Sequence, residues 1–144
     1  MYRVRGGALE VLLAHPGGPY WARKDEGAWS LPKGEFTAEE QALDAACREF
    51  EEETGFAPQG PFAPLGEVRQ KSGKRVQAWA FEGDCDCAQL RSNTFEMEWP
   101  PRSGRMQSFP EVDRIEWFDL AAARTKILPA QLPFLERLSA ACGA

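Results

Sequence analysis

The residues of this sequence that are most concentrated in chemically active side chains form one acidic segment. Residues 35–53 hold eight acids and one base, Arg48, whereas the whole chain of 144 residues carries a net charge of only −5. Most acidic runs are solvated helix faces, so the spacing must decide what this one means. At about 100° per residue, Glu49, Glu52 and Glu53 share one helix face and Glu51 points away. The spacing therefore predicts three converging carboxylates.

Three carboxylates on one face repel one another, and a hard divalent cation relieves that repulsion. Magnesium prefers oxygen ligands and is commonly held by a few carboxylates together with substrate phosphates. Gly34 lies just before the acidic helix, and without a Cβ its backbone can approach and offer a carbonyl as a further ligand. The segment thus predicts a site for magnesium and polyphosphate, with manganese as a substitute ion.

The helix that must carry these acids has clear signals at both ends. Thr37 and Glu40 form a capping box, and Gly55 is placed to end the helix, which predicts a helix over residues 38–54. A core-facing stripe recurs at i, i+3, i+4 and i+7 and comprises Leu43, Ala46, Cys47 and Phe50.

The remaining pattern predicts an α/β fold. In chain order it indicates a strand over 9–14, a hairpin over 65–70 and 75–81, a short helix or loop over 86–91, strands over 94–99 and 115–118, and two C-terminal helices. Asp119 is placed to cap the first of these helices, which runs to about residue 128. The apolar face of the second comprises Phe134, Leu135, Leu138 and Ala141. His15 falls in a Pro-Gly loop and is not expected to be catalytic.

Residues 34–56 resemble an intact Nudix box, since all nine specified positions of that motif are filled in GEFTAEEQALDAACREFEEETGF. The resemblance implies an α/β/α sandwich with a mixed β-sheet. It also implies that Glu49, Glu52 and Glu53 bind magnesium with help from the Gly34 carbonyl, and that Arg48 pairs with Glu40 to hold the loop–helix geometry.

The family's reaction is hydrolysis of a nucleoside diphosphate linked to another group, which implies a nucleoside triphosphate or dinucleoside polyphosphate as substrate. Some members take the general base from the box and others from a later loop, where Glu111 is the best-placed residue by resemblance. An ordinary exposed acid is an equally good interpretation of Glu111. Two alternatives to an enzyme are a non-catalytic nucleotide-sensing module on the same fold and a structural domain that merely binds calcium.

A nucleotide also needs cations and an aromatic platform. Candidate phosphate ligands are Arg23, Lys24, Lys33 and Arg69, and candidate stacking residues are Trp29 and Trp79. For the tryptophans, core packing is the competing interpretation.

Composition limits the remaining possibilities. The length suits one domain over residues 1–144, and the start at Met1 suggests either a truncated first strand or a homodimer that covers its edge. No apolar run approaches the roughly 18–20 residues of a membrane span, so a cytoplasmic protein without a membrane partner is expected. The four cysteines are expected as free thiols, and the negative net charge argues against nucleic acid as the main partner.

Overall fold

The computed structural model describes residues 1–32 and 41–143 of the chain. Its elements are β1 (Tyr2–Arg5), β2 (Ala8–Pro16), α1 (Ala42–Thr54), β3 (Ala63–Arg69), β4 (Arg75–Ala80), the 3₁₀ turn η1 (Cys87–Gln89), β5 (Thr94–Glu98), β6 (Met106–Pro110), β7 (Val112–Asp119), α2 (Leu120–Lys126), the 3₁₀ turn η2 (Pro129–Gln131) and α3 (Leu132–Cys142).

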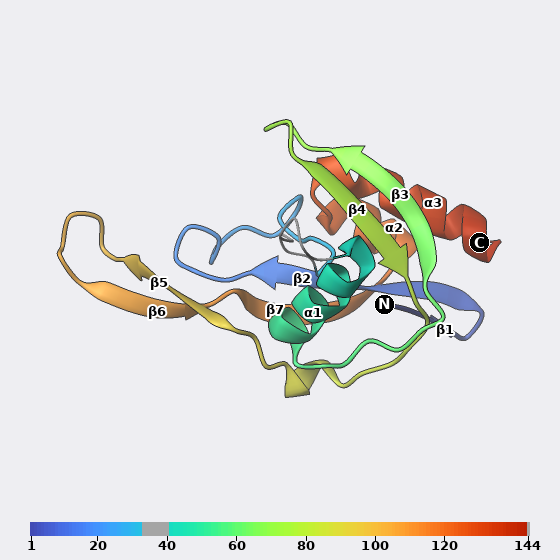
Figure 1. Cartoon of the computed structure of the whole chain (residues 1–144), viewed down its shortest axis with the longest axis horizontal. Helices are drawn as coiled ribbons and strands as arrows, with labels where there is room; N and C mark the ends of the chain where they lie inside the picture. The colour runs from blue at the N-terminus through green and yellow to red at the C-terminus, as the bar shows by residue number, and fades with distance from the viewer. Residues whose placement is uncertain (33–40, 144) are drawn as a thin grey trace.

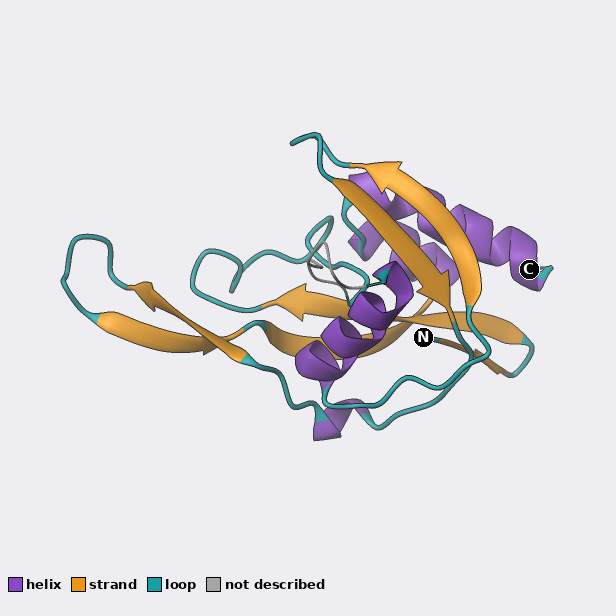
Figure 2. Ribbon diagram, viewed as in Figure 1, coloured by secondary structure: helices purple, strands orange, loops and turns teal. Residues whose placement is uncertain are grey.

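A central sheet with strand order β1-β2-β7 divides two hydrophobic cores. Leu9, Val11 and Leu13 of β2 pack into the core that includes α2 and α3, whereas Leu12 and Ala14 pack into the core beneath α1. Because successive side chains of a strand point to opposite faces, a strand covered on both sides reads as an apolar run without alternation. Figures 1 and 2 show α1 on one side of β2 and β7, with α2 and α3 on the other. The predicted α/β/α sandwich is confirmed.

Backbone hydrogen bonds make the sheet mixed. Tyr2 N–H donates to Phe81 O and Gly83 N–H donates to Tyr2 O, both at 3.0 Å, in a parallel bridge between Tyr2 and Glu82. These bonds attach the chain that leaves the β3–β4 hairpin to β1. The hairpin itself lies between two helices, because β4 contacts α1 and β3 contacts α3 (Figure 1).

The C-terminal end of α1 follows the sequence prediction. Gly55 has a left-handed conformation (φ 83°) and its N–H donates to Glu51 O, as expected of a glycine that ends a helix. Phe50 is buried, while the other stripe residues, Leu43, Ala46 and Cys47, are only partly buried. The predicted capping box of Thr37 and Glu40 lies outside the described residues.

Three predictions are corrected by the structure. The strand β6 was not predicted, and it pairs with β5 to form a two-stranded arm that projects from the body of the molecule (Figure 1). Ala141 is exposed rather than part of the α3 core face. His15 belongs to β2 and not to a loop; it is 1% exposed, with Nδ1 2.7 Å from Asp113 Oδ1 and Nε2 2.6 Å from Lys24 O. Its contacts are those of a satisfied core histidine.

The predicted role of Asp119 as the N-cap of α2 is confirmed, because its side chain accepts a hydrogen bond from Ala122 N–H at 2.8 Å. Among the described residues, no helix has the length and apolar character needed to cross a membrane.

Candidate active site

The candidate active site is built on the acidic face of α1. Glu49 is largely buried, with 12% of its side chain exposed, whereas Glu52 is 36% exposed. Arg48 lies between them, with Nη2 3.2 Å from Glu49 Oε1 and Nη1 3.0 Å from Glu52 Oε2. Glu53 is partly buried on the same helix. One guanidinium therefore neutralises two of the three predicted ligands, while the predicted partner of Arg48, Glu40, lies outside the described residues.

A fourth carboxylate approaches from the β6–β7 junction. Burial raises the pKa of Glu49, and the negative charges of Glu52 and Glu111 raise it further, while Arg48 opposes the shift. Glu111 is joined to Glu52 by backbone hydrogen bonds that run through Asn93. The structure thus places the backbone of Glu111 near the C-terminal part of α1.

A chain of backbone hydrogen bonds holds Glu111 in this position. Asn93 N–H donates to Glu52 O at 2.8 Å, Glu111 N–H donates to Asn93 O at 2.8 Å, and Gly17 N–H donates to Glu111 O at 3.0 Å. Asn93 and Gly17 therefore fix the backbone of Glu111. Sequence reasoning missed both, because their contribution comes from backbone groups that carry no residue signature.

The donor set suits a hard divalent cation. Magnesium favours carboxylate oxygens, and α1 supplies the carboxylates of Glu49, Glu52 and Glu53. Over residues 1–32 and 41–143, no three His, Cys, Asp or Glu side chains come close enough together to hold an ion. The Arg48 ion pairs must therefore open for Glu49 and Glu52 to serve as ligands, and the other predicted ligand, Gly34, lies outside the described residues.

The predicted stacking role of Trp29 is wrong. Its side chain is 1% exposed and packs edge-on against His15 and Phe118, each with ring centroids 5.1 Å apart, while its Nε1–H donates to Asp25 Oδ1. A ring buried on all sides cannot stack on a base. Trp29 instead anchors the segment that leads into the box.

Gln131 fixes the end of that same segment. Its side chain is fully buried, and its Oε1 accepts a hydrogen bond from Leu31 N–H at 3.0 Å. Together with the Ala14–Ser30 bridge, this bond sets where the chain enters residues 33–40. Sequence reasoning missed Gln131, since a lone polar residue in an apolar helix pattern is not distinctive.

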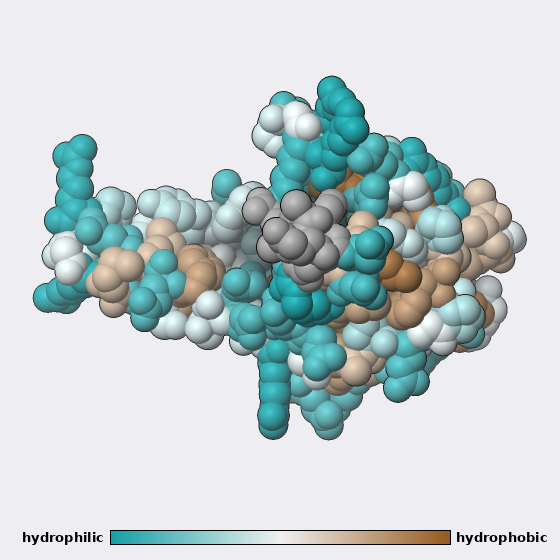
Figure 3. Space-filling view, in the orientation of Figure 1, coloured by the Kyte–Doolittle hydropathy of each residue, from teal (hydrophilic) through white to brown (hydrophobic). Residues whose placement is uncertain are grey.

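Trp79 is more accessible to a nucleobase than Trp29 is. It is partly buried in an apolar hollow of about 100 Å³ between α1 and β4, with Lys74 and Arg75 also in its wall. Figure 3 shows apolar surface next to the hydrophilic side chains of α1. Arg69 lies opposite Arg75 across the hairpin, so two cations face each other in the register of β3 and β4.

The other predicted phosphate ligands are exposed or undescribed. Arg23 and Lys24 are exposed in the loop after β2, and Lys24 Nζ lies 4.9 Å from the ring centroid of Trp21. Lys33 lies outside the described residues. The same loop carries Tyr20, which is 58% exposed and contacts Trp99 of the β5–β6 arm edge-on at 5.2 Å. Sequence reasoning did not select this aromatic pair.

The fold and the helix define a class of protein: α/β/α sandwiches that carry a carboxylate-rich helix against a mixed sheet. A NUDIX domain family model matches residues 1–138. The chain therefore belongs to the Nudix family and is a Nudix hydrolase, as the resemblance of residues 34–56 predicts. Nudix hydrolases generally use divalent metals.

Individual relatives resemble parts or all of the chain. The m7GpppN-mRNA hydrolase dcap-2 of Caenorhabditis elegans is 31% identical over 107 residues, which cover 72% of this chain and 12% of that protein. An RNA pyrophosphohydrolase of Alkalilimnicola ehrlichii is 42% identical over 50 residues, or 33% of this chain and 28% of that protein. The chain thus spans only a small part of these two relatives.

A solved structure supports the fold. The crystal structure of a C. elegans Ap4A hydrolase binary complex aligns over 99% of this chain and 93% of that chain, with a TM-score of 0.69 and 21% sequence identity.

Proposed function

We propose that this chain is a magnesium-dependent pyrophosphohydrolase that cleaves a phosphoanhydride bond in a nucleoside diphosphate linked to another group. A nucleoside triphosphate or a dinucleoside polyphosphate is the proposed substrate. The observation that carries this proposal is that Glu49 and Glu52 lie together on α1, both paired with Arg48, while backbone hydrogen bonds through Asn93 join Glu111 to Glu52. Two relatives of the chain, the dcap-2 hydrolase and the RNA pyrophosphohydrolase, also act on phosphoanhydride substrates by their names.

Glu49, Glu52 and Glu53 would hold the divalent ion together with the carbonyl of Gly34. When bound, such an ion neutralises phosphate charge and lowers the pKa of a coordinated water. Manganese is a substitute with the same preference for oxygen ligands. The planar guanidinium of Arg48, which pairs with Glu49 and Glu52, is proposed to assist the site as a residue of the same helix face.

Glu111 is proposed as the general base. A carboxylate held within reach of the attacking water can take its proton, and this contributes roughly 10²–10⁴-fold to a rate. The hydrogen bonds through Asn93 and Gly17 hold the Glu111 backbone next to α1 without using its side chain, so the carboxylate is left for chemistry.

The β3–β4 hairpin is proposed to bind the phosphate chain and base. Like charges opposite each other across a hairpin are destabilising, so an anion between Arg69 and Arg75 would relieve a cost already present in the fold. Trp79 offers an aromatic face in the adjacent hollow, and Arg23, Lys24 and Lys33 would supply further cations. The substrate-binding unit is proposed as one Nudix domain over residues 1–144.

The test is a substrate panel read with and without magnesium. Nucleoside triphosphates, dinucleoside polyphosphates, capped RNA and 5′-triphosphorylated RNA are incubated with the full chain, and the products are identified by mass. Glu52→Gln and Glu53→Gln should each lower kcat about 100-fold or more, as expected when a main electrostatic element of the transition state is lost.

Glu51→Gln is the matched control, because Glu51 belongs to the same run of acids but is exposed on another part of the helix. It should leave kcat within about twofold, since exposed surface substitutions are usually mild. Equal losses in all three variants, or near-normal rates in Glu52→Gln and Glu53→Gln, would contradict the proposed site.

A further inference from the structure

One buried side chain, the imidazole of His15, ties the loop over residues 17–24 to the central sheet. The ring is 1% exposed. Its Nδ1 lies 2.7 Å from Asp113 Oδ1 on β7, and its Nε2 lies 2.6 Å from Lys24 O at the end of the loop. The loop carries the exposed cations Arg23 and Lys24. A single ring therefore joins these two cations to β2 and β7.

The partners of the ring show which protons it carries. An ionised carboxylate and a backbone carbonyl accept hydrogen bonds but cannot donate them, whereas a neutral imidazole has one N–H and one lone pair. Because both contacts have hydrogen-bond length, both ring nitrogens must donate. His15 is therefore a doubly protonated ring with a positive charge. Asp113, whose side chain is 32% exposed, supplies the negative charge that a buried cation needs.

The other groups around the imidazole lie behind a neutral ring. Trp29 packs edge-on against it, with ring centroids 5.1 Å apart. On the indole, the Arg114 guanidinium lies 5.1 Å from the ring centroid, and Asp25 accepts the Nε1–H and also pairs with Lys126. Asp113 thus bonds to the imidazole directly, while the charges of Arg114, Asp25 and Lys126 act on it across the indole.

Loss of one proton releases the loop. The Nδ1–H is retained, because a hydrogen bond to a carboxylate is roughly twice as strong as one between neutral groups. The proton therefore leaves Nε2, and the lone pair of that nitrogen then faces Lys24 O at 2.6 Å. Two acceptors repel at this distance, so Lys24 must move away. Since the loop contact requires the doubly protonated ring, it is present at low pH and is lost as pH rises through the titration of His15.

We propose that His15 is a positioning residue for hydrolysis, which in its doubly protonated form holds the 17–24 loop so that Arg23 and Lys24 meet the phosphates of the nucleotide. The effect on catalysis rests on the proposed function, whereas the hold on the loop does not. Histidine ordinarily changes charge between about pH 5 and 8, so substrate binding through this loop weakens towards alkaline pH.

NMR tests the protonation state directly, because His15 is the one histidine of the sequence. The chain is isotopically labelled at the ring nitrogens and carries no added histidine tag. At about pH 6 we expect two ring N–H signals in slow exchange with water, and the Nε2–H signal should disappear first as pH is raised. A single ring N–H at that pH, or earlier loss of the Nδ1–H, would overturn the proposal.

Two substitutions separate the two hydrogen bonds. His15→Gln places an amide N–H where Nε2 stands, so it keeps the bond to Lys24 O at every pH, whereas His15→Asn is too short to reach that oxygen. Trypsin should cut after Arg23 and Lys24 faster in His15→Asn than in His15→Gln, and cutting of the parent relative to His15→Gln should rise with pH. Circular dichroism establishes that both variants are folded. Equal cutting of the two folded variants would overturn the hold on the loop.

Kinetics test the link to catalysis. KM for the best nucleotide should be about fivefold higher in His15→Asn than in His15→Gln, the factor that one net hydrogen bond contributes. The kcat should be similar in both, because the loop binds substrate and holds no reacting group. Equal KM values would overturn the positioning role. A parent chain that hydrolyses no nucleotide contradicts the proposed function, and the NMR and trypsin results then decide about the loop.

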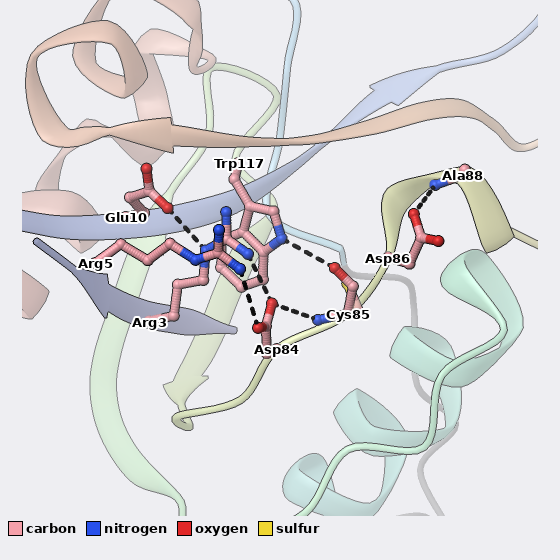
Figure 4. Close-up of polar contacts among 8 residues, drawn as sticks. All are labelled: Arg3, Arg5, Glu10, Asp84, Cys85, Asp86, Ala88 and Trp117. Atoms are coloured by element: carbon pink, nitrogen blue, oxygen red, sulfur yellow. Dashed lines mark hydrogen bonds and ion pairs between the residues drawn. The ribbon is translucent and has the colours of Figure 1, made fainter.

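Asp84→Asn is the matched control, because it removes an ion pair of similar length in another part of the molecule. Arg3 Nη1 lies 2.7 Å from Asp84 Oδ1 (Figure 4), in an open hollow that Cys85 and Cys87 also line. This variant should match the parent in trypsin cleavage of the loop and in KM. A change as large as that in His15→Asn would show that the loop responds to any lost ion pair, and would overturn the role assigned to the imidazole.

Discussion

Gly17→Ala probes how the candidate base is held. Gly17 follows β2, and a Cβ added there would overlap the Pro110 carbonyl oxygen and lie 2.9 Å from its carbon. Both atoms belong to the backbone, so β2 and the β6–β7 junction must separate to make room. Forced overpacking costs about 1–3 kcal/mol, and loss of the hydrogen bond from Gly17 N–H to Glu111 O adds about 1 kcal/mol. The free energy of unfolding should therefore fall by about 2–4 kcal/mol.

Urea denaturation measures this loss, and Gly83→Ala is its control. A Cβ at Gly83 would lie 3.4 Å from the Met1 side chain, which is an ordinary contact, so the free energy of unfolding should change by no more than about 0.5 kcal/mol. A loss below about 1 kcal/mol in Gly17→Ala would refute the close approach of Gly17 and Pro110.

The same variant tests catalysis. Separation of β2 from the β6–β7 junction would displace Glu111 relative to α1. Because small misplacements of reacting groups slow a reaction strongly, kcat for the best substrate should fall by about tenfold or more. Gly83→Ala should keep its kcat. A destabilised Gly17→Ala that retains full kcat would show that the Gly17 bond does not position the base.

Three other predictions concern single groups. Glu111→Gln should lower kcat about 100-fold while Tm stays unchanged, because an exposed carboxylate is lost from the proton-transfer step alone. Gly55→Ala should destabilise the chain by about 2 kcal/mol in urea, since φ is 83° and the new Cβ would lie 2.8 Å from Arg91 Cβ. The hydrogen bond from Arg3 holds the pKa of Asp84 below its usual value, so its stabilisation is present at neutral pH and is lost as pH falls below about 4. Asp84→Asn should therefore flatten the acid side of the Tm–pH curve, and an unchanged acid slope would contradict this reading.

Local signals in the sequence predicted the elements that depend on neighbouring residues. Gly55 ends α1 because a residue without a Cβ adopts the left-handed conformation freely, and Asp119 caps α2 through its own side chain. The β3–β4 hairpin follows from two strand-forming runs around Lys71-Ser72-Gly73-Lys74. The acidic face of α1 was likewise predicted from the spacing of its glutamates along a helix.

Local signals failed where pairing or burial came from distant parts of the chain. Residues 106–110 of β6 contain two polar residues and a proline and have no alternation, so only pairing with β5 makes them a strand. Trp29 was open to two interpretations until its contacts with His15 and Phe118 placed it in the core.

The amino-acid sequence alone determined the family, the fold class and the three helical carboxylates, because these depend on short-range spacing and on residue type. Only the tertiary structure decided that backbone bonds through Asn93 join Glu111 to Glu52, that Gly17 holds Glu111 from the other side, and that Cys85 and Cys87 face one hollow with Arg3. These contacts join segments far apart in the chain. Their formation depends on how the sheet packs against α1, which no local pattern records.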